Sequence, residues 1–501
     1  MKRRIITAFM ALSILTTLSI SCSDDFIERD IVYDITSENY FNSAEEYNYA
    51  LIAAYDLLHA TYPNVILGEI ASDNTLAGGE SANDVIGWQQ VDLMTHTPVN
   101  SNLRDIWNWM YSGVNRAAYI LEYKDKTDFE GKAQIIAEAR FLYAYYNFEL
   151  LKWFGGIPLK EDARFELGDE QVIPRASEEE VYTSIENNLL LAIEDLAPQA
   201  PQVGRVSKGA AQALLGKVYL YHATSGTGNP AKYAEAAAML DQVISSGVYS
   251  LTQGSAYATM FEEAGENGPE SVFEVQYTDV QGASFDCLQC VEGNVAVGFS
   301  GPRNYDGPLF TSGFSFNVPP TQAAAIFEDD DLRTNVTILN MATFGPDNNA
   351  TYGPGYNNTG FFNRKYIPRK RSDQAAGDLN LTNPNNYRAI RYADVLLMAA
   401  EAHNKAGNDG TAQDYLNQVR ERAYGNDSHN TSASGNNLFE EILDERRLEL
   451  FGEGHRFFDL VRTGKAAGAI PGFTANKNEV FPIPIEEIQF SNNLWNQNPN
   501  Y

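Results

Sequence analysis

Carboxylates are the most numerous groups in this chain that could do chemistry, since Asp and Glu together number 66. A glycosidase needs only two suitably spaced carboxylates, so acid content alone leaves that activity open. Other enzyme signatures are missing: the sequence has no His-Glu-x-x-His zinc motif, no Gly-x-x-x-x-Gly-Lys phosphate loop and no Gly-x-Ser-x-Gly nucleophile motif. We therefore predict no catalytic residue, no metal site and no cofactor.

Two smaller features also have a chemical interpretation. Asp329-Asp330-Asp331 could hold Ca²⁺, because hard cations bind clustered carboxylates. The run lacks the spaced ligand pattern of a calcium loop, and a solvated helix end explains it better. His455 follows Gly454 beside a turn, and a single histidine there is more often structural than catalytic. Neither feature is assigned a functional role.

Aromatic residues in the loops favour a binding site. A sugar presents a flat apolar face rimmed by hydroxyls, so its site needs exposed aromatic rings and a few directed polar groups. Trp88 lies in Gly87-Trp88-Gln89-Gln90, outside any predicted helix, and is the main stacking candidate; the alternative is a loop residue packed inward. Arg303 is a second candidate, with a structural ion pair as its alternative. The remaining binding candidates are Tyr305, Phe299, Asp73 and Asn74.

The chain has three cysteines. Cys287-Leu288-Gln289-Cys290 has neither a second cysteine pair nor a nearby His, so it cannot supply the four ligands of a tetrahedral zinc site. In an oxidising compartment, a local disulfide between Cys287 and Cys290 is the simplest interpretation. Two free thiols, or a metal or redox role, are the alternatives.

The first residues predict export. Lys2, Arg3 and Arg4 precede an apolar run, residues 5–20, that is too short for a comfortable transmembrane helix. The small residue Ser21 and then Cys22 follow this run, which predicts a lipoprotein signal over residues 1–21 and acylation of Cys22. The alternatives are an ordinary signal peptide cut nearby, or an uncut anchor. Residues 22–42 are polar and aperiodic, and we expect a tether followed by an extended arm.

The charge balance limits the partners. The net charge of the full chain is −30. Residues 1–21 carry three basic residues and no acidic one, so their removal leaves −33. Nucleic acids and anionic lipid surfaces require basic surfaces, so we expect no nucleic-acid partner and membrane contact only through the N-terminal lipid. Neutral ligands and peptides remain open.

Helical periodicity covers much of the chain. Ser43-Ala44-Glu45-Glu46 and Ser177-Glu178-Glu179-Glu180 have the capping-box form that opens a helix. The other predicted helices span 103–123, 133–153, 207–223, 231–246, 389–406, 411–423 and 438–451. The pairs 207–246 and 389–423 share a pattern in which small residues recur where helices must approach closely. Helix pairs of this length resemble tetratricopeptide units.

Residues 64–100 and 265–385 differ from the helical segments, since they are rich in Gly, Asn, Pro, Asp and aromatic residues and show little helical periodicity. Residues 272–277 alternate as a strand does. Loops this long in a compact domain are usually functional. We therefore predict a mainly α fold, in which residues 43–501 form one domain. Its tetratricopeptide-like scaffold spans about 43–260 and 386–470, and its loop-rich, minor-β ligand-binding region spans about 64–100 and 265–385.

Three segments together resemble the SusD/RagB family of nutrient-binding outer-membrane lipoproteins of Bacteroidetes. They are Glu138-Ala139-Arg140-Phe141-Leu142-Tyr143-Ala144-Tyr145-Tyr146 with Trp153-Phe154-Gly155-Gly156-Ile157-Pro158-Leu159; Arg391-Tyr392-Ala393-Asp394-Val395-Leu396-Leu397-Met398-Ala399-Ala400-Glu401-Ala402; and Glu445-Arg446-Arg447-Leu448-Glu449-Leu450-Phe451 with Glu453-Gly454-His455-Arg456-Phe457-Phe458-Asp459-Leu460. The ending, Phe481-Pro482-Ile483-Pro484 and then Asn496-Gln497-Asn498-Pro499-Asn500-Tyr501, is also similar to the family's terminus.

The resemblance implies a non-catalytic lipoprotein on the outer face of the outer membrane. Such a protein would bind a glycan, as a lid over a SusC-like TonB-dependent transporter, and help to deliver an oligosaccharide to it. Ser23-Asp24-Asp25 is similar to the acidic surface-export signal of these lipoproteins. Two alternatives remain open: a peptide or other nutrient binder of the RagB type, and a surface glycoside hydrolase.

Overall fold

The computed structural model describes residues 39–226, 228–280, 284–370 and 378–501. The predicted signal peptide, Cys22 and most of the predicted tether lie outside these residues. The described end of the arm packs onto the protein: Phe41 is fully buried, and its ring contacts those of Tyr47, Tyr119 and Tyr123.

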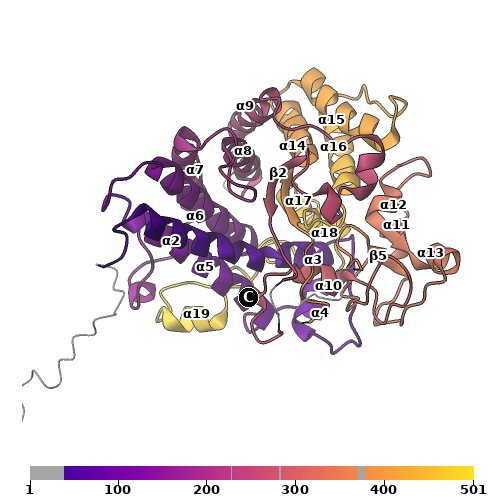
Figure 1. The fold of residues 1–501 in the computed structure, drawn as a ribbon, viewed down its shortest axis with the longest axis horizontal. Helices are drawn as coiled ribbons and strands as arrows, with labels where there is room; N and C mark the ends of the chain where they lie inside the picture. The colour runs from indigo at the N-terminus through magenta and orange to yellow at the C-terminus, as the bar shows by residue number, and fades with distance from the viewer. Residues whose placement is uncertain (1–38, 227, 281–283, 371–377) are drawn as a thin grey trace, which may run out of the picture.

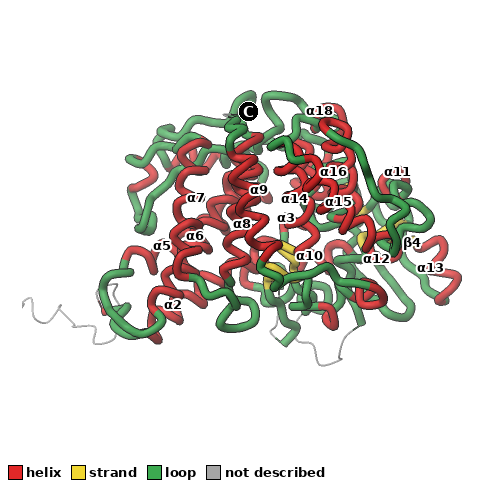
Figure 2. The backbone as a smooth tube through the Cα atoms, turned by 90° about the horizontal axis from the view of Figure 1, so that it is seen from above, coloured by secondary structure: helices red, strands yellow, loops and turns green. Residues whose placement is uncertain are grey.

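Helices dominate the described chain, as predicted (Figures 1 and 2). The long helices are α2 (Ala44–Asp56), α5 (Ser101–Glu122), α6 (Lys132–Phe154), α7 (Glu178–Asp195), α8 (Lys208–Thr224), α9 (Lys232–Ser245), α14 (Tyr392–Lys405), α15 (Asp409–Tyr424) and α16 (Gly435–Glu449). The shorter helices are α3 (Pro63–Ile70), α4 (Ile86–Asp92), α10 (Val295–Ser300), α11 (Thr321–Ala324), α12 (Thr334–Thr337), α13 (Met341–Asn348), α17 (Arg456–Arg462), α18 (Ala466–Ala469) and α19 (Ile485–Phe490).

Local sequence sets several of these boundaries. The Ser177 hydroxyl accepts a hydrogen bond from the Glu180 amide, and the Glu180 carboxylate accepts one from the Ser177 amide, so α7 begins with the predicted capping box. At the start of α2 the Ser43 hydroxyl accepts from the Glu46 amide, while the Glu46 carboxylate accepts from the Asn42 amide. Each cap satisfies amides that the first turn of a helix leaves without an intrahelical partner.

Consecutive helices pack as antiparallel pairs: α5 on α6, α6 on α7, α8 on α9, and α14 on α15. The small residues lie where the pairs approach closely. A Cβ atom added at Gly113 would meet the Tyr146 ring at 2.7 Å, and one added at Gly216 would meet Leu240 at 2.5 Å. These glycines therefore set how closely α5 approaches α6 and α8 approaches α9. The predicted helical-pair scaffold is confirmed.

The strands form three small antiparallel ladders among the described residues. β1 (Leu76–Ala77) pairs with β3 (Asn317–Val318), β2 (Ser271–Val275) with β6 (Tyr387–Arg391), and β4 (Ile338–Asn340) with β5 (Phe361–Asn363). β6 corrects the prediction of a helix from residue 389: residues 387–391 bond to β2, and α14 begins only at Tyr392.

The segment predicted as loop between 64 and 100 contains helices α3 and α4. All eight residues of α3 are buried, so the segment lacks the one-sided apolar pattern of a surface helix. Two glycines bring α3 against the turn before α17. A Cβ added at Gly68 would meet the Gly454 carbonyl oxygen at 2.6 Å, and one added at Gly454 would meet that of Asn64 at 2.0 Å.

The main hydrophobic core runs through both the helical scaffold and the loop-rich part, from Phe41 to Trp495. A smaller cluster around Tyr305, Phe310 and Leu339 lies apart from it in the loop-rich part. In Figure 2 loop segments are concentrated around α10, α11 and α12. None of the described helices is long and apolar enough to cross a bilayer.

Candidate functional site

Three loops meet beside the β1–β3 ladder and form what we call the three-loop face: residues 78–85, 302–306 and 353–357. Backbone hydrogen bonds join them directly. The Tyr356 amide donates to the Gly79 carbonyl at 2.8 Å, and the Gly353 amide donates to the Arg303 carbonyl at 2.7 Å. The Gly79 amide also donates to the carbonyl of Ser315, just before β3, at 2.8 Å. Segments more than 200 residues apart in the sequence therefore form one surface.

Each of these loops contains a non-glycine residue in the left-handed region of the backbone. Val85, Asn304 and Asn357 all have positive φ angles, as does Ser315 beside them. Val85 stands out because it is β-branched and adopts φ 38°, ψ 68° at the start of α4. Strained residues of this kind persist where the surrounding structure fixes them, and they cluster at functional sites.

Arg303 is the central polar side chain of the three-loop face. Its Nη2 donates to Asp84 Oδ2 at 3.4 Å and to the Phe314 carbonyl at 3.1 Å. Its buried Nε makes no hydrogen bond to any described residue. Asp84 is fixed in turn by the Glu80 amide at 2.8 Å. The predicted alternative for Arg303, an ion pair, is present, and the guanidinium still has donor capacity for a ligand.

Two exposed rings lie on the three-loop face or on a segment packed beside it. Tyr356, in the third loop, is 37% exposed, and Phe285 is 55% exposed. The Phe285 ring packs edge-on against Phe314 at 5.9 Å, and Phe314 lies 5.9 Å from the Arg303 guanidinium. The arrangement can offer apolar faces to a ring-shaped ligand, with charged hydrogen-bonding groups beside them.

Trp88 is placed differently from the prediction. It lies within α4 and is only 4% exposed, and its ring contacts Phe299 and Phe316 edge-on, each at 4.9 Å. Phe299 is equally buried and packs on Phe314 at 5.8 Å. The stacking role expected for Trp88 is therefore corrected to the alternative of inward packing: Trp88 and Phe299 form an aromatic support beneath Phe314 and the three-loop face.

The other predicted binding residues are held in structural contacts. Asp73 pairs with Arg456 (2.8 Å) and Arg447 (3.1 Å). Burial alone would raise the pKa of Asp73, but the hydrogen bond and charge of Arg456, with Arg447, hold it below its usual value. Asn74 is fully buried and accepts a hydrogen bond from Arg447.

Tyr305 belongs to the separate cluster with Phe310, and its hydroxyl donates to the Pro308 carbonyl at 2.5 Å. It is buried, which raises its pKa. The structure thus brings Trp88, Phe299 and Arg303 together and places Asp73 and Asn74 elsewhere, while Tyr305 belongs to the 302–306 loop but turns its side chain into the separate cluster.

The sequence prediction missed Phe285, Asp84 and Phe314. The signals for them were weak: Phe285 follows Gly282-Ala283-Ser284 and precedes the cysteine pair, and Asp84 lies in a polar run. Cys287 and Cys290 are joined by a disulfide bond.

The aspartates considered for Ca²⁺ and the histidine considered for catalysis each contact a charged or ionisable side chain. Asp331 is buried against Arg333, so it does not belong to a solvated helix end, whereas Asp330 lies 3.2 Å from His429. His455 is buried, with Nδ1 3.4 Å from Lys217 Nζ. Burial and the Lys217 charge lower the pKa of His455 to about 3, which keeps it neutral at pH 7.

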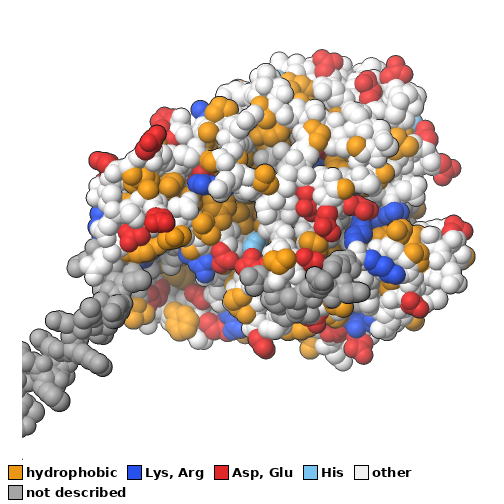
Figure 3. Space-filling view, viewed as in Figure 1, with side chains coloured by type: hydrophobic (Ala, Val, Ile, Leu, Met, Phe, Trp, Pro, Cys, Tyr) orange, Lys and Arg blue, Asp and Glu red, His pale blue; other side chains and the backbone are white. Residues whose placement is uncertain are grey.

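Surface charge on the drawn face is mixed. In Figure 3 acidic side chains are spread over this face, and the basic ones that the structure describes there form small groups beside acidic neighbours. Such a surface lacks the basic stripe that tracks a phosphate backbone.

The fold and the three-loop face define a class of protein: a scaffold of helical pairs that presents a loop-built surface. Family profiles agree with that class. The profile described as "SusD family" matches residues 333–501, and the profile described as "Starch-binding associating with outer membrane" matches residues 26–220. A SusD-like protein of Bacteroides ovatus is 28% identical over 463 residues, which cover 88% of this chain and 79% of that protein.

Solved structures extend the match. A laminarin-binding SusD-like protein is 34% identical with a TM-score of 0.83, and the match covers 92% of this chain and 100% of that one. Surface glycan-binding protein A from Bacteroides thetaiotaomicron, in complex with laminarihexaose, is 26% identical with a TM-score of 0.80, over 91% of this chain and 100% of that one. The chain belongs to the SusD family, which confirms the resemblance seen in its motifs.

Proposed function

We propose that this protein binds a glycan at the three-loop face without cleaving it. The observation that carries the proposal is the pairing of exposed rings, Tyr356 and Phe285, with the Arg303–Asp84 ion pair on one strained loop surface. Rings of this kind can stack on the apolar face of a sugar, and the charged pair can orient its hydroxyls. The glycan-binding relatives support the same ligand class.

Laminarin is the first glycan to test, because two structural relatives are described as binding laminarin or laminarihexaose. Isothermal titration calorimetry with laminarihexaose, a starch oligosaccharide panel and mixed oligopeptides compares the ligand classes directly. We expect heat of binding with at least one glycan and none with peptides. Binding of peptides alone would overturn the proposal in favour of a peptide-binding role.

Variants locate the site. Tyr356→Ala and Phe285→Ala should each weaken glycan binding about tenfold, as removal of an anchoring ring does. Tyr49→Ala is the matched control, because Tyr49 is 56% exposed on α2, in the helical scaffold. Unchanged affinity in both loop variants would place the site elsewhere. Chromatography of the glycan after long incubation tests for hydrolysis, and released shorter sugars would reject the non-catalytic role.

The proposal includes anchoring and a partner. Acylation of Cys22 would hold the protein at the outer surface of the outer membrane, beside a SusC-like TonB-dependent transporter to which it delivers the oligosaccharide. Metabolic labelling with a fatty-acid analogue should label the unsubstituted protein and should not label the Cys22→Ser variant. Affinity purification of the protein from detergent-solubilised outer membranes should recover the transporter, and its absence would contradict this part of the proposal.

A further inference from the structure

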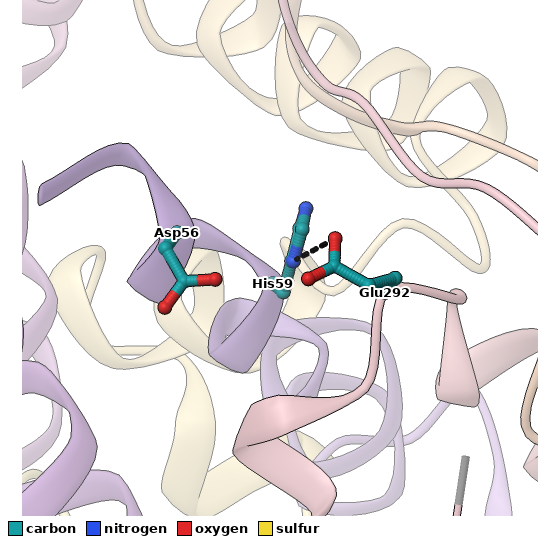
Figure 4. Close-up of side chains that lie close together, drawn as sticks. All are labelled: Asp56, His59 and Glu292. Carbon is teal, nitrogen blue, oxygen red and sulfur yellow. Dashed lines mark ion pairs between the residues drawn. The ribbon is translucent and has the colours of Figure 1, made fainter. Parts of the chain in front are cut away.

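A histidine and two carboxylates from distant segments converge on the helical side of the molecule (Figure 4). Asp56 ends α2, His59 lies in the short 3₁₀ helix that follows (Leu57–Thr61), and Glu292 follows the disulfide-closed turn. One ligand atom of each residue lies within 4.8 Å of the other two. Figure 4 shows the Glu292 carboxylate facing the imidazole from the opposite side to Asp56.

The hydrogen bonds of His59 determine which ring nitrogen faces the carboxylates. Nε2 lies 2.9 Å from the Gln276 carbonyl oxygen, which can only accept, so Nε2 carries the hydrogen. In the neutral ring Nδ1 then presents a lone pair. Nδ1 is buried, has no hydrogen-bond partner among the described residues, and lies 3.6 Å from Glu292 Oε2. That distance exceeds a hydrogen bond, and a cation between the two atoms would satisfy both.

The surroundings hold these groups in place. The Tyr277 ring lies 5.0 Å from the His59 ring, and its hydroxyl donates to the His59 carbonyl at 3.1 Å. Arg116 holds Asp56 through Oδ2 at 2.6 Å. A ring nitrogen fixed by a backbone carbonyl on its other side is the arrangement that orients metal-binding histidines.

We propose that Asp56, His59 and Glu292 bind a divalent transition-metal ion of the zinc class. One imidazole nitrogen and two carboxylate oxygens suit Zn²⁺, whereas Ca²⁺ prefers an all-oxygen set. Three protein ligands leave a position for water, and the cluster borders a surface cavity of about 320 Å³ from which water can reach it. The ion would join the end of α2 to the segment that follows the disulfide.

The test measures zinc binding by the full chain after treatment with EDTA and dialysis, in competition with a chromogenic chelator. His429 lies near Glu328 and Asp330 in a second, exposed cluster. All variants are therefore made in a His429→Gln parent, which removes that histidine. We expect the parent to bind one Zn²⁺ per chain, and a tenfold excess of Ca²⁺ to leave that binding unchanged.

His59→Gln and Glu292→Gln should each weaken zinc binding by more than the roughly 10–100-fold that loss of a supporting residue causes. His403→Gln is the matched control, because His403 contacts a single carboxylate, Asp241, at 3.0 Å. Parental zinc affinity in His59→Gln and Glu292→Gln, or no binding by the parent, would overturn the proposal.

Melting temperatures exclude a folding artefact. With EDTA present, His59→Gln and Glu292→Gln should have the same melting temperature as the parent. Added Zn²⁺ should raise the melting temperature of the parent and leave those of the two variants unchanged. If His59 and Glu292 are instead only an ion pair, both variants melt lower in EDTA and Zn²⁺ shifts none of the proteins, which refutes the metal site.

Discussion

At the residue scale, Trp88 and Tyr356 show how burial separates support from recognition. Trp88 is 4% exposed beneath the three-loop face, and Tyr356 is 37% exposed upon it. The Trp88 ring contacts Phe299 and Phe316, and through Phe299 it supports Phe314, whose carbonyl accepts from Arg303. Loss of Trp88 would therefore act on binding through the shape of the loops.

Substitution should separate the two roles. Trp88→Ala removes a large buried ring, so we expect the free energy of unfolding to fall by about 3–5 kcal/mol. Tyr356→Ala should change stability by no more than about 0.5 kcal/mol, while it weakens glycan binding about tenfold. Urea unfolding and calorimetric titration measure the two quantities. Trp88→Phe is the control, since it keeps an apolar ring, and a stable, non-binding Trp88→Ala protein would contradict the assignment.

The same residues show what the sequence could and could not predict. Composition predicted where the long loops lie. Arg303 was predicted as a binding residue or as a member of a structural ion pair, and the ion pair is present. The burial of Trp88 depends on Phe299 and Phe316, more than 200 positions away, so nothing in Gly87-Trp88-Gln89-Gln90 distinguishes a ring that faces solvent from one that faces the core. Phe285 was missed because its exposure is likewise a tertiary property.

At the scale of elements, the long helices were predicted to within a few residues, whereas the short elements α3 and β6, which are buried at every position, were not. The strand β6 was predicted as part of a helix because Tyr387–Arg391 is buried at every position, which removes the alternation that marks a half-buried strand. Its pairing with β2, more than 100 residues earlier, decides the conformation.

Helices α7 and α8 are joined by a buried histidine whose contribution depends on pH. His222 is stacked on Tyr182 at 4.5 Å and lies between Glu186 (2.7 Å) and Glu179 (2.8 Å). Burial alone would lower the pKa of His222, but the hydrogen bonds to Glu186 and Glu179 outweigh it and raise the pKa above 6.5. The protonated ring is therefore the form that holds the two helices together.

The pKa of His222 is higher in the folded than in the unfolded protein. Protonated His222 therefore stabilises the fold fully below about pH 6.5, and this stabilisation is lost as the pH rises through the folded-state pKa. His222→Gln should thus lower the free energy of unfolding by about 1.5–3 kcal/mol at pH 6, the range for hydrogen bonds to charged groups, and by less at pH 9. Urea unfolding at both pH values measures the difference. An equal loss at pH 6 and pH 9 would show that the ring acts by packing alone.

At the scale of the whole molecule, buried charges connect segments that are far apart in sequence. Charged residues three or four apart on one helix, such as those of residues 445–460, ordinarily form surface pairs worth a few tenths of a kcal/mol each. In the structure Glu449 is instead fully buried and contacts Arg333, Arg391 and Arg422. Burial alone would raise the pKa of Glu449, but Arg422, Arg391 and Arg333 hold it far below its usual value.

A second buried group extends this network. Asp459 lies 2.9 Å from Arg446 and 2.7 Å from Arg462, and Arg446 also contacts Asp394 at 2.8 Å. These contacts tie α14, α16 and α17 together. The network could not be predicted from the sequence, because its partners come from separate segments and spacing along one helix reports only neighbours within that helix.

Acid unfolding tests the network through Asp459. Burial alone would raise the pKa of Asp459, but Arg446 and Arg462 lower it from 3.8 to about 2. A lowered folded-state pKa means that the carboxylate stabilises the fold above about pH 4 and loses this effect as the pH falls toward 2. The shift corresponds to about 2 kcal/mol.

Asp459→Asn should cost about 3–5 kcal/mol at pH 7, because Arg446 and Arg462 then lose a buried partner. The difference between parent and variant should shrink by about 1–2 kcal/mol between pH 5 and pH 2.5, since in that interval the carboxylate takes up a proton in the unfolded parent and stays mostly ionised in the folded parent. Urea unfolding at pH 7, 5 and 2.5 measures the free energy of unfolding of both proteins.

The control is Asp128→Asn. The Asp128 side chain is fully exposed beside Lys132, so this variant should have the stability of the parent at every pH. A difference for Asp459→Asn that stays constant down to pH 2.5 would mean that neutralising this carboxylate does not weaken the contacts that unite the three helices.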